Sequence, residues 1–488
     1  MPRPPNVLLV MVDQMRYDTA GFAGHPLVAT PRLDGLASAG VCFETAYCPS
    51  PVCSPARASW LTGQYPHAHQ QLRNYTPQRP AEPGAHLPPS TVTIGDHLAS
   101  AGYHGGMVGC WHLGRDHEPQ HGFDWWHAYR YLGAGYEDPL FAYFEECGVD
   151  NVYLKSSSTI TQYRNTMEFG VIDDPRQQRT TWTVDRALEF LDEADPGGDG
   201  AEPFFLFVSI KDPHPIMMVP PDVLARYPFD RMPVPPTLRD PLEGKPSFHQ
   251  QGKFRIDEPV SDAQIQEMIA HYYALITHID AQVGRMLDRL EQRGIADDTL
   301  VVFISDHGEL LGDHGFTEKV LMYESSVRVP WLMRWPNGMP AGQRIRTPVD
   351  GVDLVPTLLE LSGVAQPDAG TDAIDGRSLA ADLQAGRDPA AEPVFAEVAS
   401  QRATWQGDDD PEQLAAHVMV RDGDYKYVWN RFDTDELYDL AADPDEMSNL
   451  AGAREQRGRI EELRRLIGEM VQRTGPGAYS WCADADVG

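Results

Sequence analysis

Hydrophobic residues occur along this chain in short unbroken runs that alternate with longer segments of helical spacing. Strands buried on both faces are predicted at the continuous apolar runs, residues 6–12, 103–108, 204–210 and 299–304. Helices are predicted from their spacing at residues 31–39, 93–101, 179–194, 262–293 and 353–361. This alternation indicates an α/β fold, with a large mixed, mostly parallel sheet sandwiched by helices.

The pattern changes after about residue 385. Short apolar stretches separated by turns predict a small antiparallel sheet, with strands at residues 394–398, 417–421 and 425–429. Residues 453–473 predict a charged helix beside it. Because a chain of 488 residues exceeds one ordinary domain, we expect a larger α/β domain over residues 1–385 and a smaller α+β domain over residues 386–488.

Three segments lack sustained periodicity. Residues 135–178 and 219–253 are rich in aromatic, proline or charged residues, and we expect both to be long loops that shape a substrate pocket. Residues 475–488, with Trp481 and Cys482, leave two alternatives open. They form either a disordered tail or an arm that packs on a neighbouring subunit of a homo-oligomer.

The charge of the chain excludes several classes of partner. The formal net charge of −32 argues against nucleic acid, anionic membranes or long sulfated polymers as main partners. A small anionic substrate stays compatible, because screening over about 8 Å lets a local group of cations dominate its surroundings. No stretch approaches the roughly 20 apolar residues of a membrane span, and the first residues lack a signal-peptide pattern. We therefore expect a cytoplasmic protein without a membrane segment.

Polar residues follow directly after three of the predicted strands. Asp13 and Gln14 follow the first strand, His214 follows the strand at 204–210, and Asp306 and His307 follow the strand at 299–304. In open α/β sheets, ligands bind at the carboxyl ends of the strands. Two carboxylates, an amide oxygen and an imidazole at one sheet edge are able to surround one hard divalent cation.

Cys53 stands at a predicted helix start. Pro55 suits the first helical turn, so Cys53 would lie at the positive end of the helix, where anions are stabilised. Arg57, about one turn further on, adds a fork of donors suited to a tetrahedral oxyanion. The chain has six cysteines without C-x-x-C or zinc spacing, so we expect reduced thiols. Cys53 is the candidate exception to a purely structural role.

The motif Cys53-Ser-Pro-Ala-Arg57, followed by Ala-Ser-Trp-Leu-Thr-Gly, resembles the signature of the sulfatases of the alkaline phosphatase superfamily. That group includes choline sulfatases and phosphonate monoester hydrolases. The resemblance also covers residues 6–13, 109–114, 305–323 and 435–450, and so nearly the whole chain. It implies the same fold class and a hydrolase of sulfuric esters.

The resemblance implies a chemistry for this motif. In the family, a separate formylglycine-generating enzyme oxidises the cysteine of C-x-P-x-R, so Cys53 would be the formylglycine precursor and Arg57 its anchor. Hydrated formylglycine is a geminal diol, in which one hydroxyl attacks sulfur. The other hydroxyl, once deprotonated, expels the sulfate and restores the aldehyde.

The resemblance further assigns ligands to one divalent cation, and these are Asp13, Gln14, Asp306, His307 and the modified Cys53. Calcium is the first choice for this cation; Mg²⁺ also suits oxygen ligands, and the imidazole makes Mn²⁺ compatible. Lys319 would hold the ester near its leaving group, His214 would be the leaving-group acid, and His112 would take the proton in the elimination step.

Two features depart from the usual family pattern. The loop Gly109-Cys-Trp-His-Leu-Gly114 has Cys110 where the family usually has a lysine that contacts the sulfate. Gln14 and His307 stand where many sulfatases have Asp and Asn, which is closer to the choline sulfatase and phosphonate hydrolase branch. Asn74 would replace part of the missing contact, or would cap a turn.

These observations leave three hypotheses. The first is a formylglycine-dependent hydrolase of small sulfate monoesters. The second is a hydrolase of phosphonate monoesters or phosphodiesters with the same nucleophile. The third is a non-catalytic protein that retains the fold, although such a protein would be expected to lose its nucleophile or metal ligands.

Overall fold

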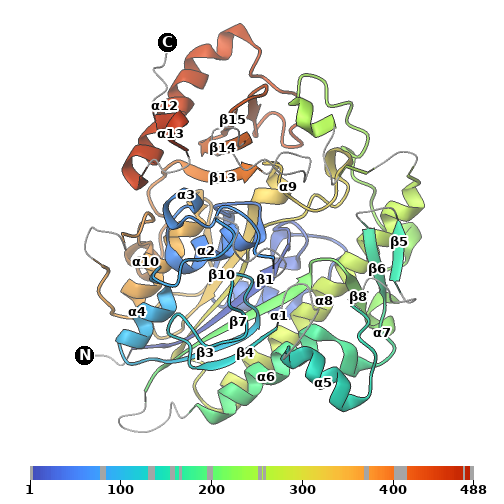
Figure 1. Cartoon of the computed structure of the whole chain (residues 1–488), viewed down its shortest axis with the longest axis vertical. Coiled ribbons are helices and arrows are strands. Elements are labelled where there is room, and N and C mark those ends of the chain that lie inside the picture. The colour runs from blue at the N-terminus through green and yellow to red at the C-terminus, as the bar shows by residue number, and fades with distance from the viewer. Residues whose placement is uncertain are drawn as a thin grey trace.

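The computed structural model describes residues 4–76, 84–129, 138–153, 160–163, 167–194, 202–250, 255–256, 260–367, 373–400, 415–475 and 479–483. Within these residues, a nine-stranded sheet runs through the centre of the molecule (Figure 1). Its strands are β1 (Asn6–Asp13), β2 (Val41–Tyr47), β3 (His104–Cys110), β4 (Trp125–Tyr129), β7 (Phe204–Pro213), β9 (Thr299–Ser305), β10 (Arg328–Arg334), β11 (Gln343–Ile345) and β12 (Val349–Asp350). They follow the order β11-β2-β10-β9-β1-β7-β3-β4, with β12 beside β2.

The sheet is mixed and mostly parallel, as predicted. Strand β1 pairs in parallel with β7 on one side and β9 on the other, and β3 pairs in parallel with β7 and β4. Strand β10 runs antiparallel to β2 and β9. The parallel central strands β9, β1, β7 and β3 therefore end at the same edge, which is where the polar residues of the site were expected.

Helices cover both faces of this sheet. The odd-numbered apolar residues of β1 pack in one cluster with α2 (Cys53–Thr62) and α10 (Leu354–Leu361). The even-numbered ones pack in a second cluster with α6 (Arg179–Glu193) and α8 (Asp262–Gln292). Figure 1 shows α2 and α10 on one side of the strands and α6 and α8 on the other. The unbroken apolar run of β1 is explained by this burial on both faces.

Two helix starts follow capping signals in the sequence. Thr93 and Asp96 form a capping box at α4 (Ile94–Ser100), and Ser261 and Gln264 form another at the start of α8. Both helices were predicted from their spacing. None of the described helices is long and apolar enough to cross a membrane. The cytoplasmic location stays a prediction.

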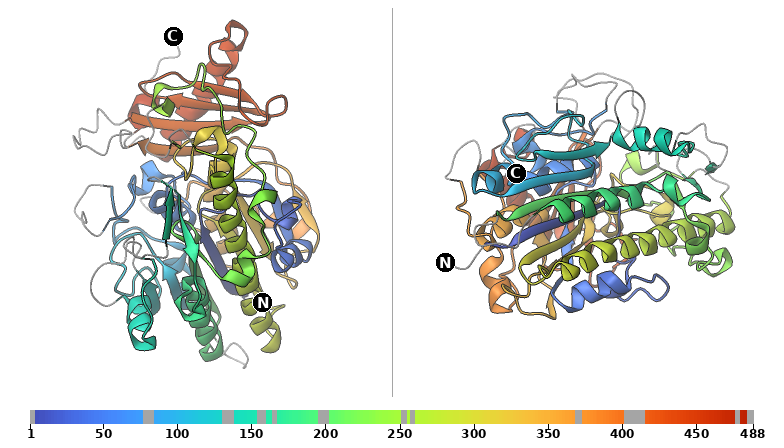
Figure 2. Two further views of the ribbon diagram at one scale, coloured as in Figure 1. Left: turned by 90° about the vertical axis from the view of Figure 1, so that its right-hand side faces the viewer. Right: turned by 90° about the horizontal axis from the view of Figure 1, so that it is seen from below.

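A four-stranded antiparallel sheet follows the larger part of the chain. Its strands are β13 (Val394–Ser400), β14 (Ala415–Asp422), β15 (Tyr425–Asn430) and β16 (Glu436–Asp439), in that order. Helix α12 (Arg457–Thr474) packs on it, and Figure 2 shows this orange and red unit at one end of the larger α/β layers. The sheet and helix were predicted, and the boundary at residue 385 stays a prediction. Tyr479 and Cys482 are buried in the same cluster as α12, so residues 479–483 pack on their own chain and the alternative of a disordered tail is wrong for them. Packing of this segment on a neighbouring subunit stays a prediction.

The prediction that residues 135–178 lack regular structure is wrong. They contain α5 (Pro139–Cys147), β5 (Ile160–Tyr163) and β6 (Met167–Val171), and β6 also pairs with β8 (Met217–Val219). Strands of four or five residues are too short to show a period, and the Asp138-Pro139 helix start was overlooked. The predicted loop 109–114 also begins later, because β3 extends to Cys110.

Candidate active site

The two aspartates of the site are brought together by the neighbouring strands β1 and β9. Val12 pairs with Ser305, and the Asp306 amide donates to the Val12 carbonyl at 3.0 Å. The chain turns sharply after Asp13, where Gln14 adopts a left-handed conformation with φ 74°. This turn lets the backbone N–H of Gln14 donate to Asp306 Oδ1 at 3.0 Å. The predicted meeting of these strand ends is therefore present in the structure.

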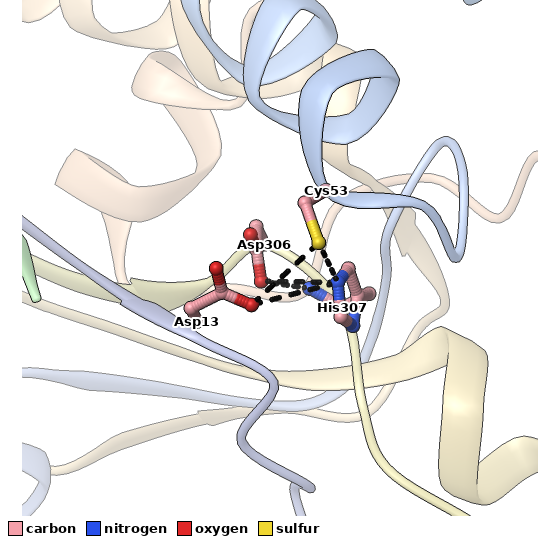
Figure 3. Close-up of side chains that lie close together, drawn as sticks. All are labelled: Asp13, Cys53, Asp306 and His307. Atoms are coloured by element: carbon pink, nitrogen blue, oxygen red, sulfur yellow. Dashed lines mark hydrogen bonds and ion pairs between the residues drawn. The ribbon is translucent and has the colours of Figure 1, made fainter. Parts of the chain in front are cut away.

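Cys53 is the first residue of α2 and is fully buried above these aspartates. Its Sγ lies 3.2 Å from His307 Nε2 and 3.8 Å from Asp13 Oδ1. Donor atoms of Asp13, Cys53, Asp306 and His307 all lie within 4.8 Å of one another (Figure 3). The helix start and two strand ends thus meet at one point.

Arg57 ties both aspartates to α2. Its Nε donates to Asp306 Oδ2 at 2.9 Å, and its Nη2 donates to Asp13 Oδ2 at 3.1 Å. Its Nη1 donates to the Cys110 carbonyl at 2.7 Å and to Ser209 Oγ at 2.6 Å. Because the guanidinium is fully buried, these contacts fix its fork between three strands and one helix.

Gln14, Lys319 and Glu309 form a second buried group beside the aspartates. Lys319 Nζ donates to Gln14 Oε1, and Gln14 Nε2 donates to Glu309 Oε2. Glu309 also accepts from the Leu311 amide at 2.8 Å, which fixes its own loop. Glu309 lies within the segment 305–323 that carries the family resemblance, where it was given no role, and the structure places it where it orients Gln14.

The two histidines outside the aspartate cluster come from loops after β3 and β7. Ser54 Oγ donates to the His112 carbonyl at 2.6 Å, which ties that loop to the start of α2. His112 has φ 61°, a left-handed conformation that is uncommon outside functional sites and turns. The His214 carbonyl accepts from Arg179 Nη2 at 2.7 Å.

Both of these histidines are neutral near pH 7. Burial, followed by repulsion from Arg57 and Lys211, lowers the pKa of His112 well below its ordinary value. Burial, followed by Lys319 and Lys211, does the same to the pKa of His214. An imidazole in this state accepts a proton rather than supplying one.

Cys110 does not present its thiol to the aspartates. Its side chain packs in an apolar cluster with Tyr129, Leu140 and Trp182, while its carbonyl accepts from Arg57 and from Ser209. The contact with the site is therefore made by the backbone of Cys110. A direct contact of its thiol with substrate stays a prediction.

Asn74 acts on the start of α2. Its Oδ1 accepts from the Ser54 amide at 2.9 Å, an amide of the first helical turn that has no acceptor within the helix. This is the capping alternative considered for Asn74. Its predicted contact with substrate stays a prediction.

We expect Asn74→Ala to lower the free energy of unfolding by about 0.5–2 kcal/mol, because the Ser54 amide loses its acceptor. Urea unfolding measures this change. Asn337→Ala is the control, since Asn337 is exposed, and it should stay within about 0.5 kcal/mol. A raised KM for substrate with unchanged stability would instead place Asn74 in substrate binding.

The cluster at the end of β1 has the chemistry of a cation site. Burial, followed by repulsion from Asp13, raises the pKa of Asp306 to about 7. Burial, followed by repulsion from Lys319, lowers the pKa of His307 to about 3, so its imidazole is neutral and able to bind a metal. Two adjacent buried carboxylates and a neutral imidazole fit a divalent cation, which would relieve their repulsion.

Comparison with known proteins agrees with this fold. The chain matches the sulfatase family over residues 5–364 and the C-terminal family of N-sulphoglucosamine sulphohydrolase over residues 312–473. It is 29% identical to an arylsulfatase of Clostridium perfringens, over 95% of this chain and 93% of that protein. It is 28% identical to a choline-sulfatase of Rhizobium meliloti, over 92% of this chain and 82% of that protein.

The crystal structure of a phosphonate monoester hydrolase of Agrobacterium radiobacter has the same fold, with a TM-score of 0.79. The identity is 23%, over 96% of each chain.

The fold and the site define an α/β hydrolase of the alkaline phosphatase type. The match over residues 5–364 covers most of the chain, and the chain therefore belongs to the sulfatase family. The resemblance noted from Cys53 and Arg57 is confirmed, and so is the expectation of a sulfatase-type enzyme. The hypothesis of a non-catalytic protein is not retained.

Proposed function

We propose that this protein hydrolyses small sulfate monoesters, with a formylglycine formed from Cys53 and with one divalent cation. The observation that carries the proposal is the meeting of Cys53, Asp13, Asp306 and His307 within 4.8 Å at the start of α2. The arylsulfatase and choline-sulfatase relatives support a sulfate ester as the substrate class.

The state of Cys53 supports its conversion. Burial, followed by the negative charge of Asp13, raises the pKa of its thiol well above the ordinary value. A neutral thiol is a poor nucleophile, so an unconverted Cys53 would be nearly idle. The formylglycine-generating enzyme is accordingly the partner required during maturation.

The surrounding side chains have separate tasks in this proposal. The neutral His112 accepts the proton of a hydroxyl at residue 53 and so releases the sulfate. Lys319 is cationic: burial opposes its charge, but the nearby carboxylates of Glu318, Asp13 and Glu309 favour it and its pKa is raised, so it holds an ester oxygen. His214 is neutral in the free protein because burial, followed by repulsion from Lys319, lowers its pKa, and the negative charge of a bound ester would offset this repulsion. It would then protonate the leaving group.

The cation would be held by Asp13, Asp306, His307 and the oxygen that replaces Sγ at residue 53. Gln14 Oε1 would be a further ligand if it gives up its hydrogen bond with Lys319. When bound, a divalent cation stabilises negative charge on the ester oxygens and acidifies a nearby hydroxyl. Carboxylate and amide oxygens favour Ca²⁺ or Mg²⁺, and the imidazole keeps Mn²⁺ compatible.

The alternative is a hydrolase of phosphonate monoesters or phosphodiesters. Gln14 and His307 favour this alternative. Judged from sequence, the choline sulfatase and phosphonate hydrolase branch has these two residues as metal ligands, where many sulfatases have Asp and Asn. It retains the same nucleophile, the same cation and the same Arg57 contacts, so the geometry at residue 53 serves both reactions.

A substrate panel separates the two. Protein made together with the maturing enzyme is first tested for aldehyde at residue 53 by peptide mass, and its metal content by elemental analysis. We expect a higher kcat/KM for an aryl sulfate than for an aryl phenylphosphonate or a diaryl phosphate. A higher value on either phosphorus ester would favour the alternative, and no turnover by fully converted, metal-loaded protein would contradict both.

A further inference from the structure

A lysine that the sequence motifs do not include lies beside the candidate site. Lys211 is near the carboxyl end of β7, and β7 lies in the sheet between β1, which carries Asp13, and β3, which ends at Cys110. The Lys211 side chain is buried, with 7% of the residue exposed. Buried lysines are rare unless an anion compensates their charge, so the surroundings of Lys211 need an explanation.

Successive side chains of β7 point to opposite faces of the sheet. Phe205 and Phe207 pack in the cluster that contains Trp60 of α2, and Ser209 Oγ accepts from Arg57 of α2 at 2.6 Å. The odd-numbered residues of β7 therefore face α2. The pairing of β7 with β1 is irregular between Ile210 and Pro213, and continuing the alternation of β7 by two residues into this part places Lys211 on the face of Cys53 and Arg57.

The even-numbered residues of β7 confirm this assignment of faces. Leu206, Val208 and Ile210 pack in the cluster that contains α6 and α8. The Asp212 carboxylate accepts from Arg179 Nε at 2.8 Å and from Thr180 Oγ1 at 2.5 Å, and both residues belong to α6. Lys211, between Ile210 and Asp212, consequently points away from α6.

Strands β3 and β7 approach closely just before this point. Gly109 has φ 101°, and a Cβ at this position would meet the Ser209 carbonyl at 2.0 Å, so no larger residue fits there. The next residue, Cys110, turns its thiol to the opposite face, where it packs near Trp182 of α6. The face toward α2 thus receives no side chain from Cys110, whereas the neighbouring strand supplies a lysine.

The electric field of Lys211 acts on the residues of the site. Burial, followed by repulsion from Arg179, lowers its pKa to about 8, and the negative charge of Asp13 opposes this decrease. Lys211 in turn contributes to the lowered pKa of His112 and of His214. Lys211 thus interacts electrostatically with Asp13 on β1 and with His112 and His214 in the loops after β3 and β7.

The site contains two other buried cations, Arg57 and Lys319. Arg57 donates to both aspartates, and Lys319 contacts Gln14 and, at 3.3 Å, Glu318. An ester with a charged group gains most from an additional cation in a site of low dielectric. Lys211 would be a third cation beside the bound ester.

We infer that Lys211 is a substrate-binding residue whose ammonium contacts an anionic oxygen of the ester. The cation is then supplied from β7 instead of from position 110 at the end of β3. This inference rests on the proposed function, because the anion it recognises is that of the ester. Lys211 would also help to determine which ester is bound. A cation on β7 reaches the bound ester from a different strand than a cation at position 110 on β3 would.

The test combines anion binding with kinetics on the full-length, metal-loaded protein. Isothermal titration calorimetry with inorganic sulfate measures binding without turnover, and an aryl sulfate assay measures kcat and KM. Lys211→Met should weaken sulfate binding by about 10- to 100-fold, the range of one charged hydrogen bond. We expect kcat/KM to fall by at least the same factor, and Lys211→Arg to recover part of both losses.

Arg346→Met is the matched control, because it removes one positive charge from a side chain that is 78% exposed. It should leave both sulfate binding and kcat/KM within about twofold. The inference would be overturned if folded Lys211→Met kept both its sulfate affinity and its kcat/KM within twofold of the parent protein. It would also be overturned if the parent protein bound no sulfate. If the parent protein bound sulfate but did not turn over the aryl sulfate, only the proposed function would be contradicted. The difference in sulfate affinity between the parent protein and Lys211→Met would then decide whether Lys211 binds the anion.

Discussion

Replacing Arg57 by methionine is expected to lower the free energy of unfolding by about 3–5 kcal/mol and to abolish turnover. Arg57 donates to Asp13 and Asp306, and all three side chains are fully buried or nearly so. Removing only the cation would leave two carboxylates facing each other without compensation. Urea unfolding of metal-free protein measures the change, because a bound cation would replace part of the lost charge.

The loss of stability in Arg57→Met should depend on pH. Burial and Asp13 raise the pKa of Asp306 to about 7 in the folded protein, although Arg57 opposes this increase. An unfolded aspartate has a pKa of about 3.9, so the folded state holds more protons in between and stability decreases as the pH rises through this window. Without Arg57 the pKa rises further, and the variant should be more destabilised at about pH 8 than at about pH 5.

A surface ion pair provides the control for Arg57→Met. Arg285 lies 2.6 Å from Asp185, and both side chains are well exposed. Arg285→Met should therefore change stability by about 0–1 kcal/mol, with little dependence on pH. Equal urea midpoints for Arg57→Met and the parent protein would mean that the buried contacts of Arg57 do not stabilise the fold.

The strand ends were predictable from sequence for a physical reason. A strand buried on both faces is an unbroken apolar run, and Asp13 and Asp306 each stand where such a run stops. In a parallel sheet these stops meet at one edge, so no distance information is needed to bring them together. The start of α2 was predictable in the same way, from Pro55 after Cys53.

Residues of the site that lie inside a run were missed. Ser209 and Lys211 look like interruptions of the strand, and their importance depends on which face of the sheet they occupy. That face is set by the pairing of β7 with β1 and β3, which a single sequence does not contain. The orientation of Gln14 by Glu309 and Lys319 likewise depends on a loop far along the chain.

Replacing Cys53 by alanine is expected to lower kcat/KM on an aryl sulfate by a factor on the order of 10⁴–10⁶, as the loss of a nucleophile does in other enzymes. The reason is that no other described side chain occupies the point between His307 and Asp13, at 3.2 Å and 3.8 Å from Sγ. Stability should change far less than in Arg57→Met, because the aspartates retain their guanidinium partner.

The conversion of Cys53 is tested by the same pair of proteins. All residues of α2 from Cys53 to Thr62 are buried, so an enzyme that reads this segment must reach it before the chain folds, and the maturing enzyme has to be present during synthesis. Parent protein made in this way should carry an aldehyde that reacts with a hydrazide probe, and Cys53→Ala should not. Cys42→Ala controls for the loss of a buried thiol and should keep both the aldehyde and turnover. Turnover by parent protein that holds only thiol at residue 53 would show that the reaction does not require the aldehyde.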